Sequence, residues 1–205
     1  MERIITAVLL FRHAELLDFA GPINVFTAAR RDADRPWFET ETPFDVWTVA
    51  ERKEPIEVWG GTVVIPRATL DEVPTPRILL VPGGWGTRSE VNNERLIKWI
   101  GETAKKAELV TSVCTGSFML AQAGLLKGKP ATTHWASIER MRKTYPDVHV
   151  KEEVAYVEDG NVVTSAGILN GVELALHVVE RYFGKDAARR AARHLEFDIP
   201  AYPRP

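Results

Sequence analysis

The chain has 205 residues, of which 45% are apolar and 26% are charged, values that are typical of a globular domain. Its 26 basic and 28 acidic residues give a net charge of −2, and no run of like charges suggests a nucleic-acid or membrane surface, because phosphate contacts need clustered Lys and Arg. No apolar run approaches the ~18 residues of a membrane-spanning helix. The single cysteine, Cys114, forms neither an intrachain disulfide nor a zinc site alone. We expect one domain over 1–205, with no metal, cofactor, nucleic-acid or membrane partner.

The first apolar segment, 4–11, allows two interpretations. A secretory signal fits poorly, because Glu2 precedes the segment, Arg12 and His13 follow it at once, and no small-residue cleavage pattern is present. The alternative is a buried first strand of a cytoplasmic protein, and this is our expectation.

Short apolar runs alternate with longer helical patterns along the chain, which is typical of a parallel α/β sheet. In chain order, the expected elements are a strand at 4–11, a helix at 21–31, a strand at 44–50, a hairpin of 56–59 with 62–66, a strand at 77–81 and a helix at 92–107. They continue with a strand at 109–113, a helix at 116–123, a strand at 131–133, a helix at 136–143, strands at 154–158 and 162–165, and helices at 168–183 and 185–195. This order predicts a single doubly wound domain with a mostly parallel sheet.

Cys114 stands between an apolar strand and a helix of small residues, in the run Thr-Ser-Val-Cys-Thr-Gly-Ser at 111–117. This is the arrangement of a nucleophile elbow, in which a sharp strand-to-helix turn lifts the side chain above the sheet. The start of a helix favours a thiolate, so we expect the pKa of Cys114 to lie below the reference value of ~8.5. The alternative is a buried cysteine that acts only as a small apolar residue.

Two further segments are expected at the carboxyl edge of the same sheet, where open α/β proteins bind ligands. Pro-Gly-Gly-Trp-Gly at 82–86 follows a strand, and its glycines can present N–H groups to a developing negative charge or simply form a glycine-rich turn. Asp18 follows the first strand among apolar neighbours. It is either the N-cap of the next helix or a carboxyl group that exchanges a proton with the thiol.

These segments together resemble the DJ-1/PfpI superfamily, a branch of the class I glutamine amidotransferase-like folds of flavodoxin-like architecture. The motifs that carry the resemblance are Leu-Asp-x-x-Gly-Pro at 17–22, Val-Pro-Gly-Gly-x-Gly at 81–86, Val-Cys-Thr-Gly-Ser at 113–117, Ala-Thr-Thr-His-Trp at 131–135 and Thr-Ser-Ala-Gly-Ile at 164–168. They occur in order and span nearly the whole chain, about 4–197. The branch most similar to this chain is isonitrile hydratase, together with the N-terminal domains of AraC-type regulators.

The resemblance implies roles for individual residues. Cys114 matches the catalytic cysteine, Asp18 the acidic residue beside it, and Thr115 the threonine that follows the cysteine in the hydratase. The backbone N–H groups of Gly84 and Thr115 match an oxyanion-hole-like pocket, and the residues expected to border it are Gly83, Trp85, His134 and Ile168. A structural hydrogen bond is the alternative role of His134. The protease branch has a histidine where Thr115 stands, so we expect no peptidase activity.

The function that the resemblance implies is a cofactor-free lyase that hydrates isonitriles to N-substituted formamides and forms a homodimer. Asp18 would position or protonate the substrate, Cys114 would attack to give a thioimidate, and water would release the formamide. The alternatives are a small-molecule or redox sensor related to AraC-type regulators, and a DJ-1-like protein that acts on reactive carbonyls. We expect no DNA-binding part, because the chain ends near the last helix of the domain.

Overall fold

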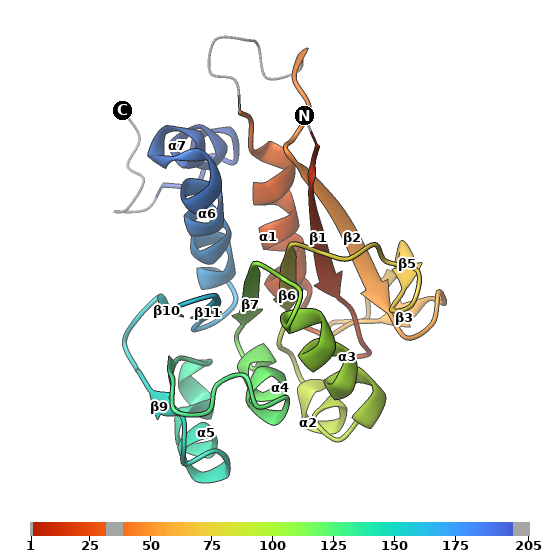
Figure 1. Cartoon of the computed structure of the whole chain (residues 1–205), viewed down its shortest axis with the longest axis vertical. Helices are drawn as coiled ribbons and strands as arrows, with labels where there is room; N and C mark the ends of the chain where they lie inside the picture. Colours follow the sequence, from red (N-terminus) through yellow and green to blue (C-terminus); the bar gives the residue numbers. More distant parts are fainter. Residues whose placement is uncertain (1, 32–38, 199–205) are drawn as a thin grey trace.

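The computed structural model describes residues 2–31 and 39–198 and contains a central sheet flanked by helices (Figure 1). The sheet has seven strands in the order β10-β11-β7-β6-β1-β2-β5, and all neighbours are parallel except the antiparallel pair β10 and β11. The strands are β1 (Ile4–Leu9), β2 (Phe44–Ala50), β5 (Ala68–Thr69), β6 (Ile78–Val81), β7 (Leu109–Val113), β10 (Tyr156–Asp159) and β11 (Val162–Ser165). The mostly parallel α/β fold expected from the sequence is confirmed.

The central strands are buried on both faces, which explains why they read as continuous apolar runs in the sequence. All residues of β6 and β7 are buried, and the register places Ile78 beside Leu109 and Val81 beside Ser112. This register brings the carboxyl ends of the two strands together, so the loop after β6 begins next to Cys114, which follows β7.

Helices cover the two faces of this sheet. α1 (Leu16–Ala28), α6 (Asn170–Phe183) and α7 (Lys185–His194) pack together, and α2 (Thr87–Glu90), α3 (Glu94–Ala104) and α4 (Gly116–Gln122) form a second group (Figure 1). The strand order places α1 and α3 on opposite faces, because β1 to β2 and β6 to β7 step in opposite directions and parallel crossovers are right-handed. Because the parallel strands β1 and β7 end at the same edge of the sheet, the helices that follow them, α1 and α4, both begin at this carboxyl edge, on opposite faces.

Two smaller units lie at this carboxyl edge (Figure 1). The expected hairpin is present, with β3 (Ile56–Glu57) antiparallel to β4 (Val63–Val64). The strand expected at 131–133 is shorter and lies outside the main sheet: β8 (Pro130–Ala131) pairs with β9 (His149–Val150), next to α5 (Ile138–Thr144).

The strand ends early because the two threonines that follow β8 bond to other segments. The backbone N–H of Thr132 donates to Thr164 Oγ1 at 2.8 Å, and Thr133 Oγ1 donates to the carbonyl oxygen of Cys114 at 3.0 Å. Both bonds tie this segment to the ends of β11 and β7, and so to the region of the elbow.

The helix expected at 21–31 begins five residues earlier than predicted, at Leu16. Proline favours the first turn of a helix, so Pro22 suggests a later start, but α1 carries Pro22 in its interior. Burial of Phe19 accounts for the longer helix. Asp18 is therefore a residue of the helix itself and not of the loop before it.

The start of α4 lies so close to the end of β6 that only glycine fits there. A Cβ atom on Gly116 would lie 2.2 Å from the carbonyl oxygen of Val81 and 2.8 Å from that of Pro82. By contrast, a Cβ atom on Gly101 in α3 would meet nothing closer than 4.0 Å.

We predict that Gly116→Ala lowers the free energy of unfolding by about 1–3 kcal/mol through overpacking, whereas Gly101→Ala raises it by about 0.4–1 kcal/mol. Urea unfolding of both variants measures the difference. Equal effects of the two substitutions would contradict the close packing of the elbow against β6.

Candidate active site at the elbow

Cys114 occupies a sharp turn between β7 and α4. Its φ is 56°, in the left-handed region that non-glycine residues adopt only rarely. Thr115 is the N-cap of α4, and the cysteine side chain is 7% exposed. The strand-to-helix turn has the geometry expected of a nucleophile elbow, in which local strain is retained because the surrounding structure fixes it.

Asp18 lies opposite the elbow and is fully buried. Its Oδ2 accepts a hydrogen bond from the backbone N–H of Gly83 at 2.9 Å. The thiol of Cys114 and the backbone N–H of Ile168 also approach the carboxyl group closely enough to lower its pKa. Among the described residues, Oδ1 has no hydrogen-bond partner of normal geometry.

The N-cap interpretation of Asp18 is wrong. The N-cap of α1 is Glu15, and Asp18 bonds to a glycine 65 residues away rather than to an N–H of its own helix. A fully buried carboxyl group is costly unless it is hydrogen-bonded, paired with a cation or protonated. The alternative, a carboxyl group held beside the thiol, agrees with this placement.

Burial dominates the electrostatics of this pair. It raises the pKa of Asp18 from 3.8 to about 7, against the opposing effect of the Gly83 hydrogen bond. Burial and then the negative charge of Asp18 raise the pKa of Cys114 to about 12, although the N–H and hydroxyl of Thr115 favour the thiolate. The expected thiolate at neutral pH is therefore wrong, because one short helix start does not offset burial beside a carboxylate.

The glycines after β6 allow close approach of three segments. A Cβ atom on Gly83 would lie 2.5 Å from Thr115 N and 2.9 Å from Asp18 Oδ2. The Gly83 N–H is taken by Asp18, and the Gly84 N–H donates to Thr115 Oγ1 at 3.0 Å. Of the two N–H groups expected to form the oxyanion pocket, that of Gly84 is thus engaged by Thr115 Oγ1, and that of Thr115 lies close enough to the sulfur of Cys114 to favour its thiolate. A role of these two groups toward an oxyanion stays a prediction.

A second threonine, Thr87, completes this network and was not identified from the sequence. Its Oγ1 lies 3.0 Å from Thr115 Oγ1 and 2.8 Å from the carbonyl oxygen of Gly84. The hydroxyl of Thr115 is thus held between the loop after β6 and α2. The only sequence signal for Thr87 is its position directly after the glycine-rich run 82–86.

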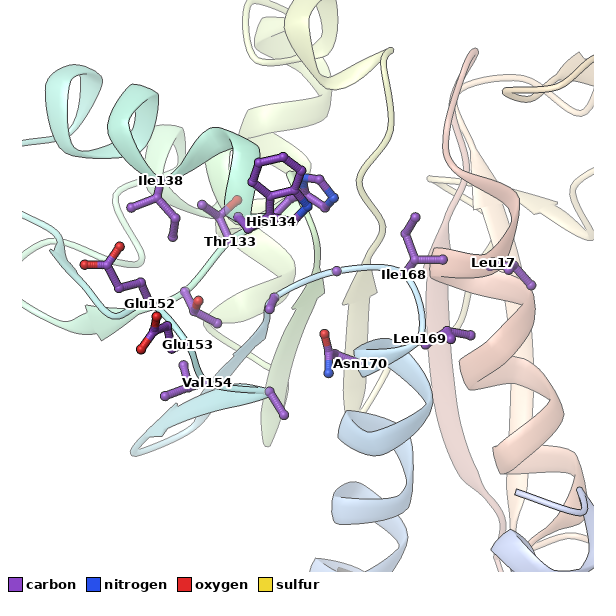
Figure 2. Close-up of a pocket in the computed structure, with 15 residues that line it drawn as sticks. Leu17, Thr133, His134, Ile138, Glu152, Glu153, Val154, Ile168, Leu169 and Asn170 are labelled. Atoms are coloured by element: carbon purple, nitrogen blue, oxygen red, sulfur yellow. The ribbon is translucent and has the colours of Figure 1, made fainter. Parts of the chain in front are cut away.

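The predicted pocket residues divide between two places. Trp85 is 55% exposed and stacks on Trp59 with ring centroids 5.8 Å apart, outside the cavity described next. His134 and Ile168 line a cavity of about 840 Å³ between the loop after β11 and the segment 152–155 (Figure 2). Ile168 borders both this cavity and Asp18, to which its backbone N–H is directed.

The cavity is mainly apolar and carries two carboxylates on one side. Figure 2 shows Glu152 and Glu153 across the cavity from Leu17, Ile168 and Leu169. The other lining residues are Thr132, Thr133, His134, Trp135, Ile138, Val154, Ala155, Ala166, Gly167 and Asn170. No sequence motif marked the segment 152–155 as part of a binding region.

His134 has the structural role that was considered for it and also lines the cavity. Its Nδ1 accepts from the backbone N–H of Ala136 at 3.3 Å, and burial lowers its pKa. A Cβ atom on Gly167 would lie 2.7 Å from the ring, so the imidazole packs closely against the loop after β11.

Within 2–31 and 39–198, no group of three or more His, Cys, Asp or Glu side chains is placed to hold a metal ion. In the same ranges, no helix combines the length and apolar character needed to cross a bilayer.

Comparisons with known proteins agree with this geometry. The chain is 34% identical to the isonitrile hydratase of Pseudomonas putida over 195 residues, which is 95% of this chain and 78% of the hydratase. It is 30% identical to the HTH-type transcriptional regulator GbdR of Pseudomonas aeruginosa over 132 residues, 63% of this chain but only 35% of the regulator. The crystal structure of a ThiJ/PfpI family protein from Pseudomonas syringae superposes with a TM-score of 0.85 at 26% identity, covering 97% of this chain and 77% of that one. The DJ-1/PfpI family model matches residues 5–181, and the chain belongs to this family.

Proposed function

We propose that this protein is a cysteine-dependent lyase that hydrates isonitriles to N-substituted formamides. The observation that carries the proposal is the buried Asp18 carboxyl group beside the Cys114 thiol, with a pKa of about 7. At neutral pH such a carboxyl group can both give and take a proton. Similarity to an isonitrile hydratase over 95% of the chain supports this choice of reaction.

In the proposed reaction, protonated Asp18 delivers its proton to the isonitrile carbon, whose lone pair accepts it. The sulfur of Cys114 then bonds to the same carbon, and the thiol proton passes to the Asp18 carboxylate. The sum of these transfers is R–N≡C plus HS–Cys giving R–N=CH–S–Cys, a thioimidate. No standing thiolate is required, which fits the raised pKa of Cys114.

Water completes the cycle by adding to the thioimidate carbon. One proton of the water goes to nitrogen, the other restores the thiol, and the C–S bond breaks to release R–NH–CHO. No oxyanion arises in the first stage, so the engagement of the Gly83 and Gly84 N–H groups by Asp18 and Thr115 is compatible with it. The apolar cavity beside Ile168 has room for the N-substituent.

The same proposal includes a homodimer, as the resemblance to the DJ-1/PfpI superfamily implies, and a cytoplasmic location, as expected from the interpretation of segment 4–11 as a buried strand. Thr115 offers no general base of the kind that a Cys-His peptidase needs, so peptidase activity is not part of the proposal.

A sensor of small molecules is the second candidate, favoured by the similarity to GbdR over 132 residues. A sensor would bind its ligand at the elbow and release it unchanged. An enzyme would convert an isonitrile to a formamide that is detectable by mass spectrometry. A panel of isonitriles, dicarbonyl compounds and amides, tested with wild type and with Cys114→Ala, separates hydratase, carbonyl-directed and non-catalytic alternatives.

We predict that Asp18→Asn lowers formamide production by ~10²–10⁴-fold, because the amide keeps the shape of the side chain but carries no transferable proton. Cys114→Ala is expected to be equally inactive, and the double variant no worse, since residues acting as one unit are not additive. Asp71→Asn is the matched control, because Asp71 is exposed and, among the residues that the structure describes, its carboxylate pairs with Arg95 alone, at 2.9 Å. Near-normal turnover in Asp18→Asn would refute the mechanism.

The raised pKa of Asp18 also predicts a pH-dependent stability difference. The folded state holds its proton up to about pH 7, whereas the unfolded chain releases it near 4. Wild type therefore loses stability as pH rises from about 4 through 7, by an amount on the order of a few kcal/mol. Asp18→Asn lacks this loss.

Thermal unfolding of both proteins at pH 5 and pH 8 tests this second prediction. The melting temperature of Asp18→Asn relative to wild type is expected to be higher at pH 8 than at pH 5. The same difference at both pH values would show that burial does not shift the titration of Asp18.

A further inference from the structure

Two arginines lie beside the elbow and are anchored on the segments that build it. The Cζ atom of Arg140, on α5, lies 4.1 Å from the ring centroid of Phe118, which belongs to the first turn of α4. The Cζ atom of Arg88, on α2, lies 3.9 Å from the ring centroid of Trp85. Stacking on an aromatic ring fixes the plane of a guanidinium group while leaving its N–H donors available.

Neither arginine has a carboxylate within ion-pair distance among the residues that the structure describes. Arg140 makes one long hydrogen bond, to Ser137 Oγ at 3.4 Å. Arg142, two residues further along α5, is by contrast paired with Glu139 and Glu152 at 2.6 and 3.0 Å. In α5, Arg142 is thus paired with carboxylates of the protein, whereas Arg140 is not.

Arg140 is close enough to both Arg88 and Cys114 to be affected by their charges. Arg88 directly follows Thr87, whose hydroxyl lies 3.0 Å from that of Thr115 at the elbow. Burial and the charge of Arg88 lower the pKa of Arg140, whereas the negative form of Cys114 raises it. Two cations held near each other without an anion repel, and an anion placed between them relieves that repulsion. Two guanidinium groups also offer the paired N–H donors that a carboxylate accepts best.

We propose that Arg140 and Arg88 bind a carboxylate group on the substrate while its reacting carbon faces Cys114. The proposal extends the proposed hydration to isonitriles that carry a carboxylate. Its anion-binding part depends on the arginines alone and is testable without any turnover.

Alkylation of Cys114 by iodoacetate and by iodoacetamide measures the anion preference directly, because the two reagents differ chiefly in the charge of the group beside the reactive carbon. Both react with the same sulfur, so a change in the pKa of the thiol cancels in the ratio of their rates. We expect Arg140→Gln to lower the iodoacetate-to-iodoacetamide ratio by about three- to tenfold at low salt, as for a partly exposed charge contact. The Arg88→Gln, Arg140→Gln double variant is expected to lower it further.

Arg142→Gln is the matched control, since it removes a charge from the same helix where that charge is already paired. Its ratio is expected to equal that of wild type. An unchanged ratio in the double variant, or an equal fall in Arg142→Gln, would overturn the proposal.

Turnover separates this proposal from the function on which it builds. With isocyanoacetate and its neutral methyl ester as substrates, Arg140→Gln is expected to lower the ratio of kcat/KM for the carboxylate to kcat/KM for the ester, in which any change in the reactivity of the thiol cancels. If neither compound is hydrated but the alkylation ratio depends on Arg140, hydration is refuted and the carboxylate site stands. If both compounds are hydrated and the ratio of their kcat/KM values does not respond to Arg140, the carboxylate site is refuted and hydration stands.

Discussion

The structure of the site depends on one buried hydrogen bond, from the backbone N–H of Gly83 to the carboxyl group of Asp18 at 2.9 Å. It joins α1 to the loop after β6, and Thr115 reaches the same loop from the elbow. A side chain on Gly83 would separate all three segments. Because this bond satisfies only one carboxyl oxygen, burial still raises the pKa of Asp18 to about 7. The hydrogen bond that joins Asp18 to Gly83 therefore positions the carboxyl group and still leaves its pKa near neutrality.

The proposed reaction depends on the protons held by Asp18 and Cys114 rather than on a preformed thiolate. A Cys-His pair activates sulfur by removing its proton in advance. Here the neighbouring carboxylate opposes thiolate formation, so this pair suits a reaction that consumes a proton at carbon before sulfur attacks. Hydration of an isonitrile is such a reaction, whereas hydrolysis of a peptide begins with attack on a carbonyl group.

The sequence predicted most of the fold, because buried parallel strands such as β6 and β7 are continuous apolar runs and Cys114 lies directly between a strand and a helix. It misplaced the start of α1, since Pro22 favours a first turn and tertiary burial of Phe19 outweighs that preference. The predicted thiolate state of Cys114 was also wrong. Burial and the charge of Asp18 raise the pKa of the thiol, and both arise only when separate segments of the chain meet in the fold. Arg140 had no sequence signal at all, since its relation to Phe118 depends on the packing of α5 against α4.

The pH dependence of Cys114 alkylation by iodoacetamide in wild type and in Asp18→Asn tests the coupled pair most directly. With the pKa of Cys114 raised to about 12, the wild-type rate is expected to be still rising at the highest pH at which the fold persists. Removing the charge of Asp18 is expected to shift the profile to lower pH. A wild-type rate that reaches its plateau below pH 8, or profiles with the same midpoint in both proteins, would contradict the coupling of Asp18 to Cys114.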